Sequence, residues 1–104
     1  MKVIQIVPRK TMRLYDDLLD KEEAIRERGR GTFFRAGRKK RSSVTWKHKA
    51  YRGWVKLERG LSDDVTAKIR AQPPEREWQM LSAFLGFVDR HFGPKISAIN
   101  VSYR

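Results

Sequence analysis

The sequence of 104 residues contains no cysteine. Disulfide bonds, thiolate catalysis and cysteine-based zinc or iron–sulfur sites are therefore excluded. Histidine is scarce too, because His48 and His91 are the only two, and a zinc site would need further ligands. We expect no metal ion and no other cofactor. A chain without cysteine suits the reducing cytoplasm, where disulfides are rare.

Long apolar segments are also missing. Near the N-terminus the sequence has only a short, mostly apolar run from Val3 to Val7. A signal peptide needs an apolar core of about 7–15 residues, and a membrane span needs about 20. We therefore expect a soluble, cytoplasmic protein with no membrane partner. A chain of this length has room for one domain, residues 1–104, and none for a deep active site between two domains.

Acidic residues are nearly absent from one third of the chain, the basic segment from Arg28 to Arg59. Twelve basic residues accompany a single acid there, Glu58, so the segment carries +11 of the total charge of +12. The twelve are Arg28, Arg30, Arg35, Arg38, Lys39, Lys40, Arg41, Lys47, Lys49, Arg52, Lys56 and Arg59. The residues before the segment balance to zero. Such a concentration of charge predicts a polyanionic partner.

The first part of the chain predicts a strand, a helix and a short strand. Residues 3–7 are β-branched and apolar on both faces, which is typical of a central strand buried on two sides. Residues 11–28 have helical composition, with Thr11 as the expected N-cap. Residues 32–35 form a candidate short strand. The four adjacent cations Arg38–Arg41 then indicate an exposed loop, because like charges side by side resist burial.

Three strands are expected to follow as an antiparallel meander, at residues 44–49, 54–59 and 65–72. Apolar residues hold even positions in the first of these strands and odd positions in the second. A turn or bulge must therefore separate them, and we place it at residues 50–53. The alternation predicts which side chains face the core. These are Val44, Trp46, Val55, Leu57, Val65 and Ile69.

A second helix is expected to begin at Pro73–Pro74 and to end before Gly93–Pro94. Its expected apolar stripe consists of Trp78, Leu81, Leu85, Val88 and Phe92, with Met80, Phe84 and Phe87 beside it. A last strand is expected at residues 96–103. The order of strand, helix, four strands, helix and strand predicts an α+β fold. Its antiparallel sheet would have about four to six strands, with both helices packed on one face and the other face open.

The outward positions of the meander combine cations with one tryptophan. They are Thr45, Lys47, Lys49, Trp54, Lys56, Lys68 and Arg70. Lysine and arginine bind phosphates, and an aromatic ring can stack on an unpaired base, so one surface offers both contacts. The loop of Arg38, Lys39, Lys40 and Arg41 would extend this surface along a nucleic-acid backbone. Any single lysine is more simply explained as solubilising charge, and only their concentration favours binding.

No catalytic motif is present, and the residues favour a binding protein over an enzyme. His48 and His91 fall at inward and edge positions, where a partly buried histidine with a hydrogen-bond partner is the commoner case. Asp63–Asp64 lies in an expected turn and has no third carboxylate nearby in sequence. One catalytic arrangement stays open. His48, Tyr51 and Arg52 could serve a small, toxin-like ribonuclease through proton transfer and charge stabilisation, without a metal.

The sequence thus predicts a nucleic-acid-binding module. RNA is placed ahead of DNA because the expected surface is an open sheet with an aromatic residue, and not a recognition helix. The first alternative is the metal-independent ribonuclease. The second is an interaction protein that binds an acidic protein partner or forms a homodimer through an exposed strand edge.

Overall fold

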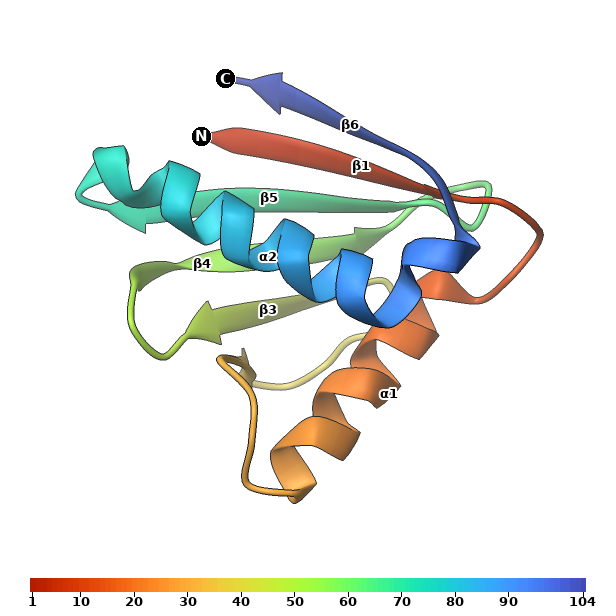
Figure 1. The fold of residues 1–104 in the computed structure, drawn as a ribbon, viewed down its shortest axis with the longest axis horizontal. Coiled ribbons are helices and arrows are strands. Elements are labelled where there is room, and N and C mark those ends of the chain that lie inside the picture. Colours follow the sequence, from red (N-terminus) through yellow and green to blue (C-terminus); the bar gives the residue numbers. More distant parts are fainter.

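The computed structural model describes residues 1–104, which form one six-stranded antiparallel sheet and two α-helices, in the predicted element order. The strands are β1 (Lys2–Pro8), β2 (Phe33–Ala36), β3 (Ser43–His48), β4 (Arg52–Arg59), β5 (Val65–Gln72) and β6 (Ile96–Tyr103). The helices are α1 (Leu14–Glu27) and α2 (Glu77–Phe92), and a single 3-10 turn lies at each end of α2. Across the sheet the strands follow the order β2-β3-β4-β5-β1-β6 (Figure 1).

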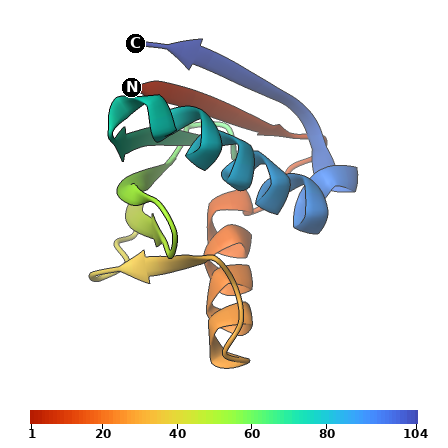
Figure 2. The same cartoon turned by 60° about the vertical axis from the view of Figure 1, so that its left-hand side comes forward.

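Both helices pack on the same face of the sheet. Helix α2 lies against β5, while α1 contacts β2 and β4 at the other end of the sheet (Figure 2). The predicted inward side chains of β3, β4 and β5 are all buried there, within one cluster of 22 residues that includes side chains of both helices. Alternation along each strand leaves every second side chain of these strands on the opposite face. Neither helix has the length and apolar character needed to cross a membrane.

The turn between β3 and β4 exchanges the faces as predicted. Val44 pairs with Leu57 and Trp46 with Val55, so even positions of β3 and odd positions of β4 share the core face. The turn is shorter than expected, because β4 already begins at Arg52. Gly53 therefore lies within the strand. Its φ is 129°, a conformation that residues with a Cβ atom rarely adopt.

Two predictions near the N-terminus are wrong. Strand β1 is not buried along both faces: Ile4 and Ile6 are fully buried on the helix side, whereas on the other side Val3 is buried but Gln5 is exposed. A β-branched run shows strand propensity, but it does not show whether a second layer covers the strand. Thr11 does not cap α1. The chain first runs beside the end of α2, where the backbone N–H of Arg9 donates to Lys95, and the helix begins only at Leu14.

The apolar stripe of α2 is rotated from the predicted one. Trp78 is 55% exposed, although it was expected in the core. Its place in the first turn is taken by Glu77, which is 6% exposed and lies 3.7 Å from the ammonium of Lys2. The periodicity of apolar residues does not reveal a buried acid, because the ion pair that accompanies its burial comes from another part of the chain. The buried face of α2 is Glu77, Met80, Leu81, Phe84, Phe87, Val88 and Phe92.

We predict opposite effects for two glycine-to-alanine substitutions. A Cβ at Gly53 would collide with the carbonyl oxygen of Arg70 and lie 2.7 Å from the Cα of Ala71, so Gly53→Ala should lower the free energy of unfolding by about 2–4 kcal/mol. A Cβ at Gly86 in α2 would meet no atom within 4 Å. Gly86→Ala should therefore raise that free energy by about 0.5–1 kcal/mol. Urea unfolding of both variants measures the difference. Equal effects would contradict the close contact between β4 and β5.

Candidate nucleic-acid interface

The face of the sheet opposite the helices, here called the open face, carries the predicted combination of cations and tryptophan. Lys47, Lys56 and Arg70 are exposed there, and Trp54 lies among them, partly buried. Trp54 stands directly opposite Arg70 on the neighbouring strand. The alternation of buried and exposed residues along β3, β4 and β5 thus produces the surface that the sequence indicated.

Two lysines of the open face lie directly opposite each other on neighbouring strands. Lys56 pairs with Lys68 in the register of β4 and β5, and like charges in this position destabilise a sheet. Glu58 relieves the repulsion, because its carboxylate lies 3.0 Å from the ammonium of Lys68. Lys56 forms no ion pair. Of the two, Lys56 is therefore the one with its charge available to a ligand.

Two hollows adjoin Trp54. The first, called the turn hollow, has a volume of about 430 Å³ and lies at the turn between β3 and β4. Its cations are Lys47, Lys49, Arg52 and Arg70. The second, called the loop hollow, has a volume of about 360 Å³ and lies beside the loop that precedes β3. Its cations are Arg38, Lys40 and Lys56. Trp54 lines both hollows, so its side chain lies where the two meet.

None of these seven cations is paired with an acid. No acidic residue lines either hollow, and no ion pair involves any of the seven. Uncompensated positive charge around one aromatic ring destabilises the free protein through mutual repulsion. A polyanion that lies across Trp54 would remove that repulsion.

Phe34 also lines the turn hollow, and the sequence did not assign it to the site. In β2 it pairs with Lys47, which places both side chains on the open face. Its neighbour Phe33 points the other way and is 5% exposed in the core. Adjacent residues of a strand face opposite sides, so one of the two phenylalanines had to point outward. The sequence could not tell which, because the register of β2 depends on its pairing with β3.

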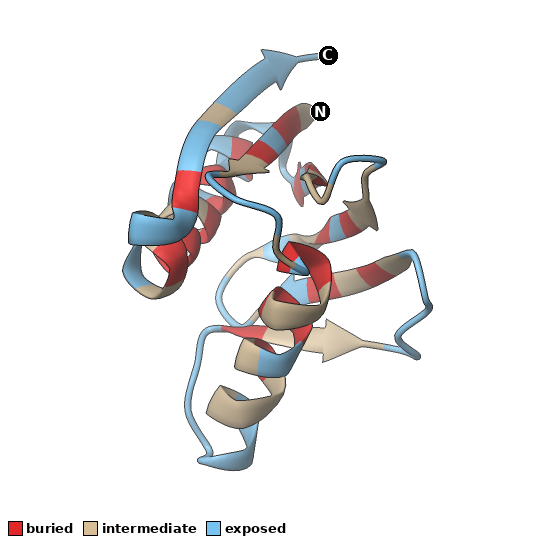
Figure 3. Cartoon of the chain, turned by 90° about the vertical axis from the view of Figure 1, so that its right-hand side faces the viewer, coloured by how far each residue is buried: buried red, intermediate tan, exposed pale blue.

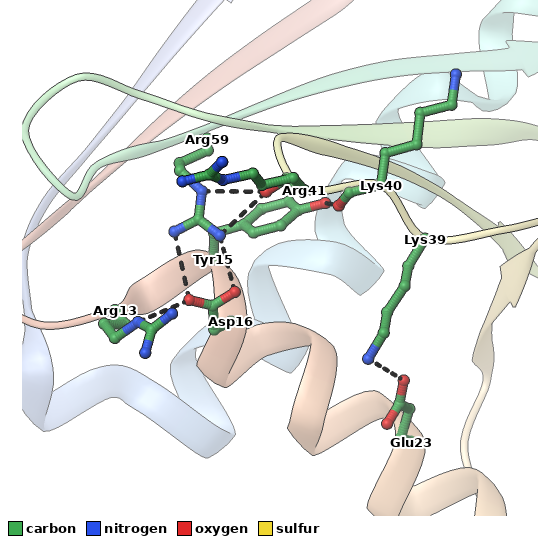
Figure 4. A network of polar contacts seen from close by, with 8 residues as sticks. All are labelled: Arg13, Tyr15, Asp16, Glu23, Lys39, Lys40, Arg41 and Arg59. Carbon is green, nitrogen blue, oxygen red and sulfur yellow. Dashed lines mark hydrogen bonds and ion pairs between the residues drawn. The ribbon is translucent and has the colours of Figure 1, made fainter.

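The loop from Gly37 to Ser42 is held against α1 by a network of polar contacts (Figure 4). The guanidinium of Arg59 bonds to both carboxylate oxygens of Asp16, at 2.8 and 3.3 Å, and donates to the backbone oxygen of Arg41. The hydroxyl of Tyr15 donates to the backbone oxygen of Lys40 at 2.8 Å. The bond from Arg59 holds the pKa of Asp16 below its ordinary value, so the carboxylate keeps its charge, and the clamp its ion pair, further into the acid range than a free aspartate would.

This clamp separates the four cations of the loop. Lys39 points to α1, where its ammonium lies 3.1 Å from Glu23 and lowers the pKa of that carboxyl. Arg41 borders a different hollow, between the loop and α1, which also contains acids. Arg38 and Lys40 line the loop hollow beside Trp54. Of the predicted site, the structure thus leaves Lys39, Arg41 and Lys68 outside the two hollows.

The residues named for a ribonuclease do come together. His48, Tyr51 and Arg52 line the turn hollow, and the rings of His48 and Tyr51 stack with centroids 4.6 Å apart. The Nδ1 atom of His48, however, accepts a hydrogen bond from the backbone N–H of Ala50 at 2.9 Å. The lone pair of the neutral imidazole is therefore occupied, which weighs against His48 as a general base in this arrangement.

The other candidate chemical groups have structural surroundings. His91 packs on Phe87, with ring centroids 4.8 Å apart, at the edge of the α2 stripe as predicted. Asp64 accepts hydrogen bonds from Gln5 and from the backbone of Ser62, so its carboxylate stabilises the turn before β5. The bonds of Asp64 fit the simpler interpretation that the sequence favoured. His91 is partly buried as expected, but its contact is the ring of Phe87 and not the expected hydrogen-bond partner.

No protein-family model matches this chain, and neither a curated protein nor a solved structure is significantly similar to it. Function must therefore be inferred from the chemistry of the open face. That face offers fixed positive charge, two aromatic rings and two shallow hollows.

We predict that His48 titrates below its ordinary pKa of 6.5, because burial between Phe33 and Tyr51 disfavours the charged ring. The unfolded chain then binds the proton more readily, so this contribution to stability is complete above pH 6.5 and is lost as the pH falls towards the folded pKa. NMR titration of the imidazole protons, assigned with His48→Gln, measures the midpoint. A midpoint above 6.5 would show that the ring is not held in this environment.

Proposed function

We propose that this protein binds single-stranded nucleic acid, RNA ahead of DNA, across its open face. The observation that carries the proposal is the position of Trp54, whose ring lies between two hollows lined by unpaired cations. A base stacks on the indole, and the phosphates on either side of that base reach the cations of the two hollows. Stacking on an aromatic ring is favourable for every base, so the binding has low sequence specificity.

Phe34 and Trp54 provide two stacking positions in the turn hollow. Lys47 lies on β3, the strand between them, and its side chain is exposed on the same face. A strand of nucleic acid that runs across β2, β3 and β4 would therefore meet an aromatic ring, a cation and a second aromatic ring in turn. Alternation of bases and phosphates along a single strand matches this order.

Neither helix is suited to the groove of a duplex. Helix α1 contains six acidic and two basic residues, so it would be repelled by phosphates. Helix α2 is largely apolar and buries one side in the core. Recognition of double-stranded DNA usually places a helix in the major groove. The absence of such a helix favours unpaired bases, which are the usual target of RNA-binding sheets.

Substitution of Trp54 tests the stacking contact. Trp54→Ala should weaken binding of a short unstructured RNA about tenfold, because stacking on an aromatic residue contributes about 1–3 kcal/mol per base. The matched control is Trp78→Ala, which removes the solvent-exposed tryptophan of α2, away from the open face. Fluorescence anisotropy with a labelled RNA measures both affinities. Equal losses in the two variants would contradict the role of Trp54.

Substitution of three cations tests the charge contribution. Lys47, Lys56 and Arg70 should each contact a phosphate, so their joint replacement by alanine should reduce the slope of log K against log salt by about 2. Lys10, Arg90 and Lys95 form the matched control, since they are exposed, unpaired and of the same residue types. Their replacement should leave the slope nearly unchanged. An identical slope in both triple variants would show that charge acts without regard to position.

A metal-independent ribonuclease is the second candidate, because His48, Tyr51 and Arg52 share the turn hollow with Lys47 and Lys49. Incubation of an end-labelled RNA with the protein and a chelator separates the two functions. We expect intact RNA, since the lone pair on Nδ1 of His48 already accepts a hydrogen bond from the backbone N–H of Ala50. Cleavage that disappears in His48→Ala would establish the enzyme instead.

A further inference from the structure

The sheet has two edges, and they differ in their protection. The β2 edge has only four residues, and Arg35 on it pairs with Glu23 of α1. The β6 edge has eight residues, Ile96 to Tyr103, with no charged side chain and no proline. Figure 3 shows β6 exposed along most of its length. Short length, charge, proline and bulges are the usual means by which proteins block pairing at an edge, and β6 beyond its register shift at Ser97 has none of them.

The outward backbone groups of β6 follow from its pairing with β1. Met1 and Arg104 exchange both backbone hydrogen bonds, at 2.6 and 2.7 Å. In an antiparallel pair such exchanges recur at every second residue, so Ser102, Asn100 and Ala98 also direct their N–H and C=O groups to β1. The groups of Ile99, Val101 and Tyr103 then point away from the sheet, where no strand receives them. Ser97 lies at a register shift, between the partners of Pro8 and Val7, so the alternation does not extend to it.

We propose that two copies of this chain pair through β6, antiparallel about a twofold axis, to form one continuous twelve-stranded sheet. An antiparallel edge is self-complementary, because rotation by 180° brings its donors opposite its own acceptors. The outward residues also carry the exposed apolar side chains Val101 and Tyr103, which are 39% and 69% exposed. A second β6 strand beside them would cover part of that surface.

The hydrogen-bonding pattern selects the register. If Val101 faces Val101 of the second copy, then Ile99 pairs with Tyr103 across the axis, and all three outward residues exchange bonds in both strands. If Asn100 faced its own equivalent, Ile99 would pair with Val101, but Tyr103 would lie opposite Ser97 at the register shift. The structure therefore favours the register centred on Val101, in which the two Val101 Cα atoms form a hydrogen-bonded pair about 5.5 Å apart.

Charge repulsion does not prevent this dimer. Strands β5 and β1 separate β6 from the cations of β4. With about 4.8 Å between strands, the β4 strands of the two copies would be about 34 Å apart. That distance is several Debye lengths at physiological ionic strength, about 8 Å, so the two basic regions barely interact. The twofold axis is perpendicular to the sheet and leaves both open faces on the same side. The inference does not depend on the function of that face.

Cross-linking tests the register directly, because the chain has no cysteine of its own. Val101→Cys places two thiols opposite each other at a spacing that a disulfide spans. We expect it to form a covalent dimer under mild oxidation. Tyr103→Cys lies on the same face of β6, but it would oppose Ile99 and not its own equivalent, so it should remain largely monomeric. Similar cross-linking of both variants, or of neither, would refute the register centred on Val101.

Size-exclusion chromatography with light scattering tests the dimer without a cross-link. At about 100 µM the wild-type chain should have twice the mass of one 12.3 kDa chain. Val101→Glu should raise the dissociation constant at least tenfold, because like charges would face each other at the axis, whereas Ser102→Glu should change it less than about threefold. A mixture of Val101→Glu and Val101→Lys should restore the dimer. A monomeric wild-type chain at this concentration would overturn the proposal, whether or not the protein binds RNA.

Discussion

Burial of one face of the meander by α1 and α2 is the constraint on which the rest of the molecule depends. Because side chains alternate along β3, β4 and β5, fixing Trp46, Val55 and Ile69 in the core leaves no choice for their neighbours. Lys47, Trp54 and Arg70 must then lie on the open face. A shift of one residue in any of these strands would bury a cation, at a cost of several kcal/mol. The candidate interface is thus held by the same burial that holds the fold.

The fold also distributes the charge of the basic segment. Arg35, Lys39 and Arg59 are used by the acids of α1, where they hold the loop and β2 in place. The seven cations around Trp54 have no such partners. A segment that looks uniform in sequence therefore has two parts, one structural and one available for binding. Tyr15 helps to hold Arg59 beside α1, since the guanidinium of Arg59 lies 4.6 Å from the centre of the Tyr15 ring.

The sequence predicted the element order and the inward face of the meander because both depend on local periodicity and on turns. It failed where tertiary partners decide the outcome. Glu77 is buried through its pairing with Lys2, which moved Trp78 to the surface. Gln5 is exposed because no second layer covers β1 on that side.

Within the candidate site, too, local periodicity was predictable from the sequence and tertiary pairing was not. Lys47, Trp54, Lys56 and Arg70 were predicted from strand alternation alone. Phe34 was missed because its face depends on the pairing of β2 with β3. Lys39 and Lys68 were included because their ion pairs with Glu23 and Glu58 join residues distant in sequence or on neighbouring strands. Sequence alternation predicts where a side chain points, but it does not predict which charge already has a partner.

If RNA binds at the open face around Trp54, NMR titration with a short unstructured RNA at low salt should locate the contact there. We expect the largest shifts for the Trp54 indole N–H and for the backbone amides of Phe34, Lys47 and Arg70, with α2 nearly unaffected. Shifts concentrated on α2 or on the hollow between α1 and its loop, or the absence of any shift, would show that the open face is not the binding surface.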